Sequence, residues 1–278
     1  MLHAASLRNR CPEYSAGSSS SRRFRGLNYV SLHGMPSQIE KLEAHAGHLL
    51  DAFIGLREKY AMLEPMLFDP DTNKKRGSRE QARGFQILRN SLFLSCAQDI
   101  AKLTLDADKR TPSIRNLVEA FGDAALVTDL EDRYAIWVIP SVGEETDPEI
   151  VAALRRMEEC ERVERREQFR EYMAKLRRLW AEISSAPAMN GLLTVRDKVS
   201  AHTEVRFVAD RYQLVDIGTL GIKWRDLRAS IESMQQLIEL IGLIVRNAGF
   251  AWDSLEHQLS EASRSFWEVP VDASKQVG

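Results

Sequence analysis

The chain has 278 residues, of which 44% are hydrophobic and 28% are charged, and this balance excludes global disorder. Its 38 Lys and Arg residues and 40 Asp and Glu residues give a net charge of −2, so any contact with nucleic acid must be local. No uncharged apolar run reaches the roughly 18 residues that a membrane-spanning helix needs. We therefore expect a soluble, cytoplasmic protein that makes no contact with a membrane.

The contents of Cys, Gly and Pro favour helices. The three cysteines, Cys11, Cys96 and Cys160, are far apart, which argues against a disulfide framework and a structural zinc site and favours a reducing cytosol. Only 15 Gly and 9 Pro are present, too few turn formers for a many-stranded fold.

Residues 1–34 differ in composition from the rest of the chain. They hold five arginines against the single acid Glu13, around a serine run at 18–21. Such a segment cannot build a core, so we expect a disordered tail or an extension upstream of a true start at Met35. An organelle transit peptide has a similar composition, but this segment lacks the apolar stripe of one.

Two capping boxes predict the first two helices. Ser37 and Glu40 begin a helix over 38–64, which Pro65 is expected to stop. A polar loop follows over 69–77. Ser78 and Gln81 then begin a second helix that extends to about residue 105.

The middle of the chain is also predicted to be mostly helical. A third helix begins after Pro112 and extends through Phe121. The apolar run 134–139 fits either a short strand or a buried connector. Asp147 and Pro148 begin a long fourth helix to about Ser184, whose alternating charges are typical of a solvated helix.

Two further helices complete the predicted fold. One follows Pro187, and the other extends from Leu227 to Val245 with apolar residues at steps of three and four. We predict an all-α bundle of five to six helices over residues 35–255, with a C-terminal tail at 256–278.

Two groups of residues resemble metal sites only in part. His45 and His48 lie one helical turn apart, which gives half a site and no third ligand. Asp69, Asp71, Asn73 and Glu80 have the spacing of a calcium loop, but Lys74 takes the place of the required glycine and begins a run of three cations. We expect no metal and no cofactor.

Arg196 and His202 form the remaining candidate site. On an α-helix Arg196, Val199 and His202 are offset by about 60° each, so the Arg and the His would border one face about 9 Å apart along the axis. A second copy across a two-fold axis could close that gap. The alternative is that Arg196 pairs with a carboxylate and His202 caps the helix.

The surrounding residues resemble a known motif. Leu193, Arg196, Asp197, Lys198, Ala201 and His202 are similar to the Arg-polar-x(n)-His motif of the HEPN superfamily, in the branch named after the abortive-infection protein AbiU of phage defence. The resemblance covers about residues 38–250 and includes Leu88–Ser95, Asp99–Leu103, Asp106 and Trp224–Leu227. Asp197 departs from it, since Asn is frequent there, and the charged fourth helix looks like an elaboration.

The resemblance implies a homodimeric helical bundle that cleaves RNA, not DNA, without a metal. His202 would be the general acid or base, Arg196 would bind the phosphoryl oxygens, and Asp197 could orient one of them. An antitoxin or a nucleotidyltransferase is implied as a partner. Two other interpretations stay open, namely a non-catalytic HEPN module that binds a nucleotide or a partner protein, and a structural helical adaptor.

Overall fold

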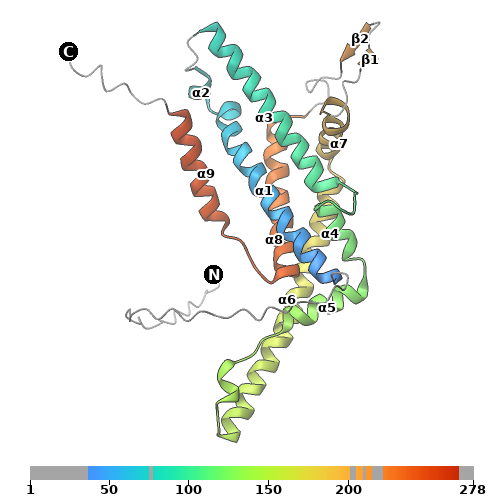
Figure 1. Cartoon of the computed structure of the whole chain (residues 1–278), viewed down its shortest axis with the longest axis vertical. Helices are drawn as coiled ribbons and strands as arrows, with labels where there is room; N and C mark the ends of the chain where they lie inside the picture. The colour runs from blue at the N-terminus through green and yellow to red at the C-terminus, as the bar shows by residue number, and fades with distance from the viewer. Residues whose placement is uncertain (1–36, 75–77, 201–204, 209–210, 215–221, 269–278) are drawn as a thin grey trace, which may run out of the picture. The chain divides into compact units, whose positions relative to one another are not determined.

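The computed structural model describes residues 37–74, 78–200, 205–208, 211–214 and 222–268 (Figure 1). Within these residues the chain is almost entirely helical. The α-helices are α1 (Gln38–Phe68), α2 (Pro70–Lys74), α3 (Arg79–Leu105), α4 (Ile114–Ala120), α5 (Ala124–Ala135), α6 (Pro148–Ser184), α7 (Pro187–Thr194), α8 (Trp224–Arg246) and α9 (Trp252–Trp267).

Short elements of other kinds join these helices. A 3-10 turn, η1 (Pro140–Gly143), precedes α6, and a π-helical turn, η2 (Val195–Ser200), follows α7. Strands β1 (Val205–Val208) and β2 (Arg211–Leu214) form an antiparallel hairpin in which Val205 pairs with Leu214. The all-α class predicted from the sequence is confirmed, since this hairpin holds the only strands among the described residues.

Both capping boxes form as predicted. At the start of α1 the Ser37 hydroxyl accepts from the Glu40 amide at 3.2 Å, and the Glu40 carboxylate accepts from the Ser37 amide at 2.7 Å. Ser78 and Gln81 make the same reciprocal pair at the start of α3. Each pair satisfies two backbone donors that a helix start leaves without a partner.

Helix α1 continues past Pro65, which was expected to stop it. Proline has no amide hydrogen, so the carbonyl of Ala61 cannot receive its usual bond within the helix. The Ser263 hydroxyl of α9 donates to that carbonyl instead, at 2.7 Å, and the indole of Trp267 donates to the carbonyl of Met62 at 3.1 Å. A later helix therefore supplies the donors that allow α1 to continue to Phe68.

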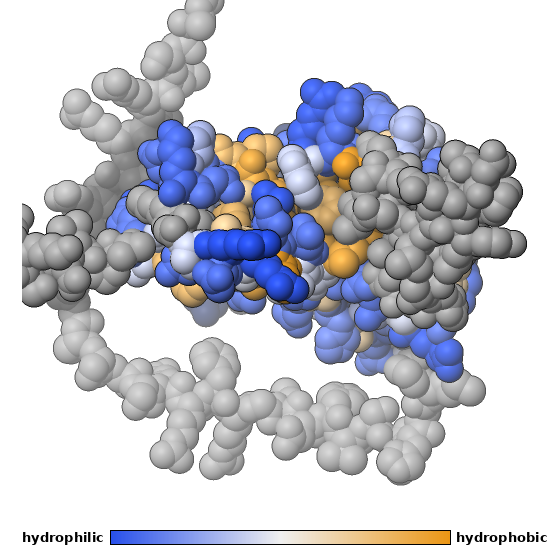
Figure 2. Space-filling model, turned by 90° about the horizontal axis from the view of Figure 1, so that it is seen from above, coloured by the Kyte–Doolittle hydropathy of each residue, from blue (hydrophilic) through white to orange (hydrophobic). Residues whose placement is uncertain are grey.

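Helix α1 lies at the centre of the core and contacts α3, α8 and α9, while α6 packs on α5 and α8. Phe53, Phe93 and Phe169 are fully buried between these helices. Helix α8 contributes the stripe predicted from its steps of three and four, including Leu227, which is fully buried. Seen from the end at which α3 begins, apolar residues form a central area between hydrophilic ones (Figure 2).

Three helices were not predicted. Helix α2 lies in the expected polar loop, and α5 begins directly after its cap Asp123, whose carboxylate accepts from the amides of Ala125 and Leu126. Helix α9 occupies residues assigned in part to a C-terminal tail, and it forms a helix because it has α1 to pack on. The run 134–139 is neither the short strand nor the buried connector that the sequence left open, since it ends α5 and continues as a connector in which Ile136 and Val138 are exposed. The buried carboxylate of Glu158 in α6 accepts from the amide of Ile139 at 2.8 Å.

Two expectations concern the ends of the chain and the membrane. The prediction of a disordered tail or start-site extension at 1–34 lies outside the described residues. Among the described residues, no helix has the length and apolar character needed to cross a membrane.

Candidate functional site

The predicted site begins where α7 passes into η2. The fully buried residues Leu192 and Val195 anchor this junction, and both α7 and η2 pack against α3. A π-helical turn bonds each amide to the carbonyl five residues earlier, which is rare and frequent at functional sites. The burial of Leu192 and Val195 fixes the start of the motif against α3.

Arg196 and Asp197 are the two site residues whose side chains the structure describes. The Nε of Arg196 donates to Oδ1 of Asp197 at 2.7 Å, and the side chains are 32% and 50% exposed. Arg196 therefore pairs with a carboxylate, as one of the two sequence interpretations proposed, and the carboxylate is its own neighbour's. The partial exposure leaves this pair within reach of a ligand.

His202 lies outside the described residues, and so does the side chain of Val199. The structure changes one premise of the sequence argument, because residues 195–200 are π-helical and not α-helical. The predicted offsets of 60° assumed the geometry of an α-helix, which this turn does not have.

Two other stretches that carried the family resemblance meet in space. Trp224, at the start of α8, packs edge-on against Phe93 of α3 with ring centroids 4.8 Å apart. The guanidinium of Arg89 lies over the same indole, 5.7 Å from its centroid. Because η2 also packs on α3, one helix carries the contacts of all three stretches.

Asp99 and Asp106, the two acids among the residues that carried the family resemblance, have structural roles. Asp99 accepts from Nζ of Lys59 at 2.6 Å and so ties α3 to α1. Asp106 caps the end of α3 and accepts from the amide of Asp108 at 3.0 Å. Neither contact is with Arg196.

A shallow cavity of about 650 Å³ lies between α7 and the start of α8. Thr194, two residues before Arg196, lines it, as do the exposed cations Lys223 and Arg225. The Thr194 hydroxyl already donates to the carbonyl of Asn190 at 2.9 Å, and Asp226 also lines the cavity, so the two cations are the groups here that suit phosphate oxygens. Lys223 and Arg225 were not among the predicted site residues, although they flank Trp224 in the sequence.

The weaker metal candidates take on other roles. Asp69 accepts from the amides of Asp71 and Thr72 at 3.0 and 3.1 Å and so caps α2. Burial, with Lys41 and His48 nearby, lowers the pKa of His45. Among the described residues, no three His, Cys, Asp or Glu side chains gather as a metal site does.

Comparison with known proteins agrees with the resemblance. A family model of the HEPN type, described as AbiU2, matches residues 39–266. No curated protein and no solved structure matches the chain. The matched range covers all of α2 to α8, and all but one residue of α1 and of α9.

Proposed function

Because this chain belongs to the AbiU2 family of HEPN proteins, whose membership implies abortive-infection phage defence, we propose that it acts there as a metal-independent endoribonuclease. The observation that carries the proposal is the partly exposed Arg196, which follows the buried Val195 on a π-helical turn and lies two residues after Thr194 of a cavity with exposed cations. In this proposal Arg196 and His202 are the catalytic residues.

The chemistry needs no group beyond those of the protein and the RNA. The 2′-hydroxyl loses a proton to one His202 and forms a bond to phosphorus, while the bond to the 5′-oxygen breaks. A second His202, from the other copy in a homodimer, gives a proton to the leaving oxygen. The products are a 2′,3′-cyclic phosphate and a free 5′-hydroxyl.

Besides proton transfer, the reaction needs a group that stabilises the charge on the phosphoryl oxygens, and arginine suits this role. Its planar fork of donors matches two oxygens of a phosphate at once. The Nε of Arg196 is engaged by Asp197, which fixes the direction in which the guanidinium points. Lys223 and Arg225 are the groups we propose for the flanking phosphates of the RNA.

A second candidate function is a non-catalytic module that binds a nucleotide or a partner protein. The observation that favours it is the same ion pair, because Asp197 partly neutralises Arg196 and adds a negative charge where phosphate should bind.

The test is cleavage of a mixed tRNA and mRNA pool in EDTA by the full chain. We expect Arg196→Ala and His202→Ala each to lower the cleavage rate by about 100-fold or more, since general acid–base catalysis contributes about that much. The matched controls are Arg83→Ala and His48→Ala, which change an exposed residue of the same type on α3 and α1.

The ends of the RNA fragments give a second readout. A 2′,3′-cyclic phosphate that depends on His202 supports the proposal. Undiminished cleavage by His202→Ala would end it. Intact RNA after incubation with the folded wild-type protein would favour the binding module.

A further inference from the structure

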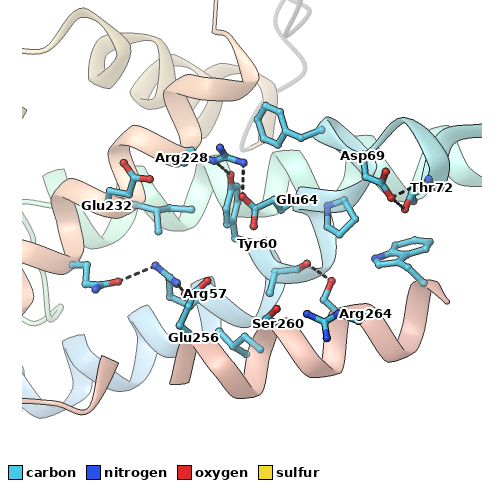
Figure 3. Close-up of a pocket in the computed structure, with 18 of the residues that line it drawn as sticks. Arg57, Tyr60, Glu64, Asp69, Thr72, Arg228, Glu232, Glu256, Ser260 and Arg264 are labelled. Carbon is cyan, nitrogen blue, oxygen red and sulfur yellow. Dashed lines mark hydrogen bonds and ion pairs between the residues drawn. The ribbon is translucent and has the colours of Figure 1, made fainter. Parts of the chain in front are cut away.

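A second cavity is lined by residues of α1, α8 and α9, and no residue of η2 lines it. It is a groove of about 1090 Å³ with α1 as its floor and α8 and α9 as its walls (Figure 3). It shares no lining residue with the cavity beside Thr194. Helix α9 rests mainly on α1, and Ser263 is its only buried residue, so the wall that it forms stands apart from α8.

The groove has an apolar interior. Phe68 of α1 is 40% exposed although it is a large aromatic residue, and Ala61 and Pro65 lie beside it. Trp252 and Trp267 are half-buried at the two ends of α9. They are fifteen residues apart, or about 22 Å on a helix, so the groove has the length of about four helical turns.

The charged groups that line the groove are mostly acidic. Carboxylates outnumber guanidinium groups by seven to three. Two of the three arginines are already paired, as Arg57 contacts Glu256 and Arg228 donates to Glu64 at 2.5 Å (Figure 3).

Three other carboxylates stand on the walls. Glu232 lies on α8, where its charge also acts on Arg57, and Asp253 and Glu268 lie at the two ends of α9, on the same wall as Arg264. Like charges on two walls of one groove repel, and their potential disfavours RNA and favours a cation. An occupant that places cations at both edges and apolar groups on the floor matches the excess of carboxylates and the apolar residues, although Arg264 lies on one wall and the Arg228 guanidinium lies over the Phe68 ring, 4.3 Å from its centroid.

We propose that this groove is a docking site for a basic amphipathic helix of a partner protein. A helix of about four turns, with an apolar stripe toward Phe68 and Pro65, brings lysines or arginines on its flanks to the carboxylates of both walls. The occupant is a peptide segment and not a small cation, because a groove of this length and volume greatly exceeds one alkylammonium group.

The test is binding to the full chain, followed by fluorescence anisotropy. The probe is a labelled 15-residue peptide with leucines at helical spacing and lysines on both flanks. A matched peptide has glutamate in place of every lysine. We expect the basic peptide to bind, the acidic one not to bind, and the affinity to fall as salt screens the charges.

Two pairs of variants locate the binding site. Ser260→Trp fills the groove from α9, and its control Ser254→Trp places the same bulk on another side of that helix. Glu232→Lys reverses a charge on α8, and its control Glu171→Lys does so on an exposed site of α6. We expect each groove variant to weaken binding by about tenfold or more and each control to leave it unchanged.

Several results would overturn the proposal. These are the absence of binding by the basic peptide, equal binding by the acidic peptide, and equal effects of a groove variant and its control. Displacement of the peptide by spermidine at an equal concentration would assign the groove to a small polyamine instead. Circular dichroism of each variant establishes that it is folded.

Discussion

At the scale of single residues, the ion pair between Arg196 and Asp197 affects how strongly the proposed site would bind a phosphate. The two side chains bond at 2.7 Å while both are partly exposed to water. Water screens such a pair, so a phosphate can compete with Asp197 for the guanidinium. If the site binds RNA as we propose, Asp197 both orients Arg196 and lowers its attraction for the phosphates.

The change Asp197→Asn separates these two effects. Asparagine keeps an oxygen that can accept from Arg196 and removes the negative charge, so we expect RNA to bind several-fold more tightly. The measurement is RNA affinity at low salt in a His202→Ala background, where no cleavage interferes. Asp129→Asn, at an exposed site on α5, is the control. Weaker binding by Asp197→Asn would mean that its orienting role outweighs its charge.

At the scale of elements, local signals predicted most of the helices. Ser37, Glu40, Ser78 and Gln81 give the starts of α1 and α3 because capping depends on residues three apart in the sequence. The continuation of α1 past Pro65 was not predictable in this way, because its donor, Ser263, lies 202 residues away along the chain. The end of α1 thus depends on tertiary contacts.

The candidate site was predictable to a similar degree. The motif identified Arg196 and Asp197, and the structure describes them together on one turn. The π-helical turn was not foreseen, because the apolar spacing of a short segment does not distinguish bonds to the fourth residue from bonds to the fifth. Lys223 and Arg225 were missed because they come near Thr194 of α7 only in the folded chain, where α7 and α8 both pack on α3.

The connector between α5 and α6 gives a prediction about stability. Glu158 is 8% exposed, and its carboxylate accepts from the amide of Ile139. Glu158→Ala leaves that amide without its partner, so we expect the free energy of unfolding to fall by about 1–3 kcal/mol. Urea denaturation measures this loss. Glu158→Gln keeps an acceptor and should lower the free energy of unfolding by less. Glu159→Ala, at the exposed neighbouring position, should leave it nearly unchanged. Equal losses of stability in all three variants would show that the bond to Ile139 does not contribute to stability.

At the scale of the whole molecule, α9 is the least integrated of the long helices. It buries only Ser263, and its donors satisfy two carbonyls near Pro65. Its removal therefore takes away one wall of the groove while leaving η2, α3 and α7 in place.

A chain that ends after Asp253 tests this division. We expect it to stay folded, with an unfolding free energy lower by about 2–3 kcal/mol from the lost bonds and apolar contacts. It should lose affinity for the basic peptide and keep the RNA cleavage rate of the full chain. Thermal denaturation, anisotropy and the EDTA cleavage assay give the three readings. A truncated chain without a cooperative transition would show instead that α9 is part of the core.

The central position of α1 also affects how the protein is made. α1 is the first of the described helices to leave the ribosome, yet α8 begins only at Trp224, about 150 residues after α1 ends. At roughly 5–20 residues per second, roughly 10–30 s pass before α8, one of the helices on which α1 packs, has been synthesised. During that time the apolar face of α1, which includes the fully buried Phe53 and Leu56, has only part of the core that covers it in the finished protein. We therefore expect chaperones that hold nascent chains to bind this face of α1 during synthesis.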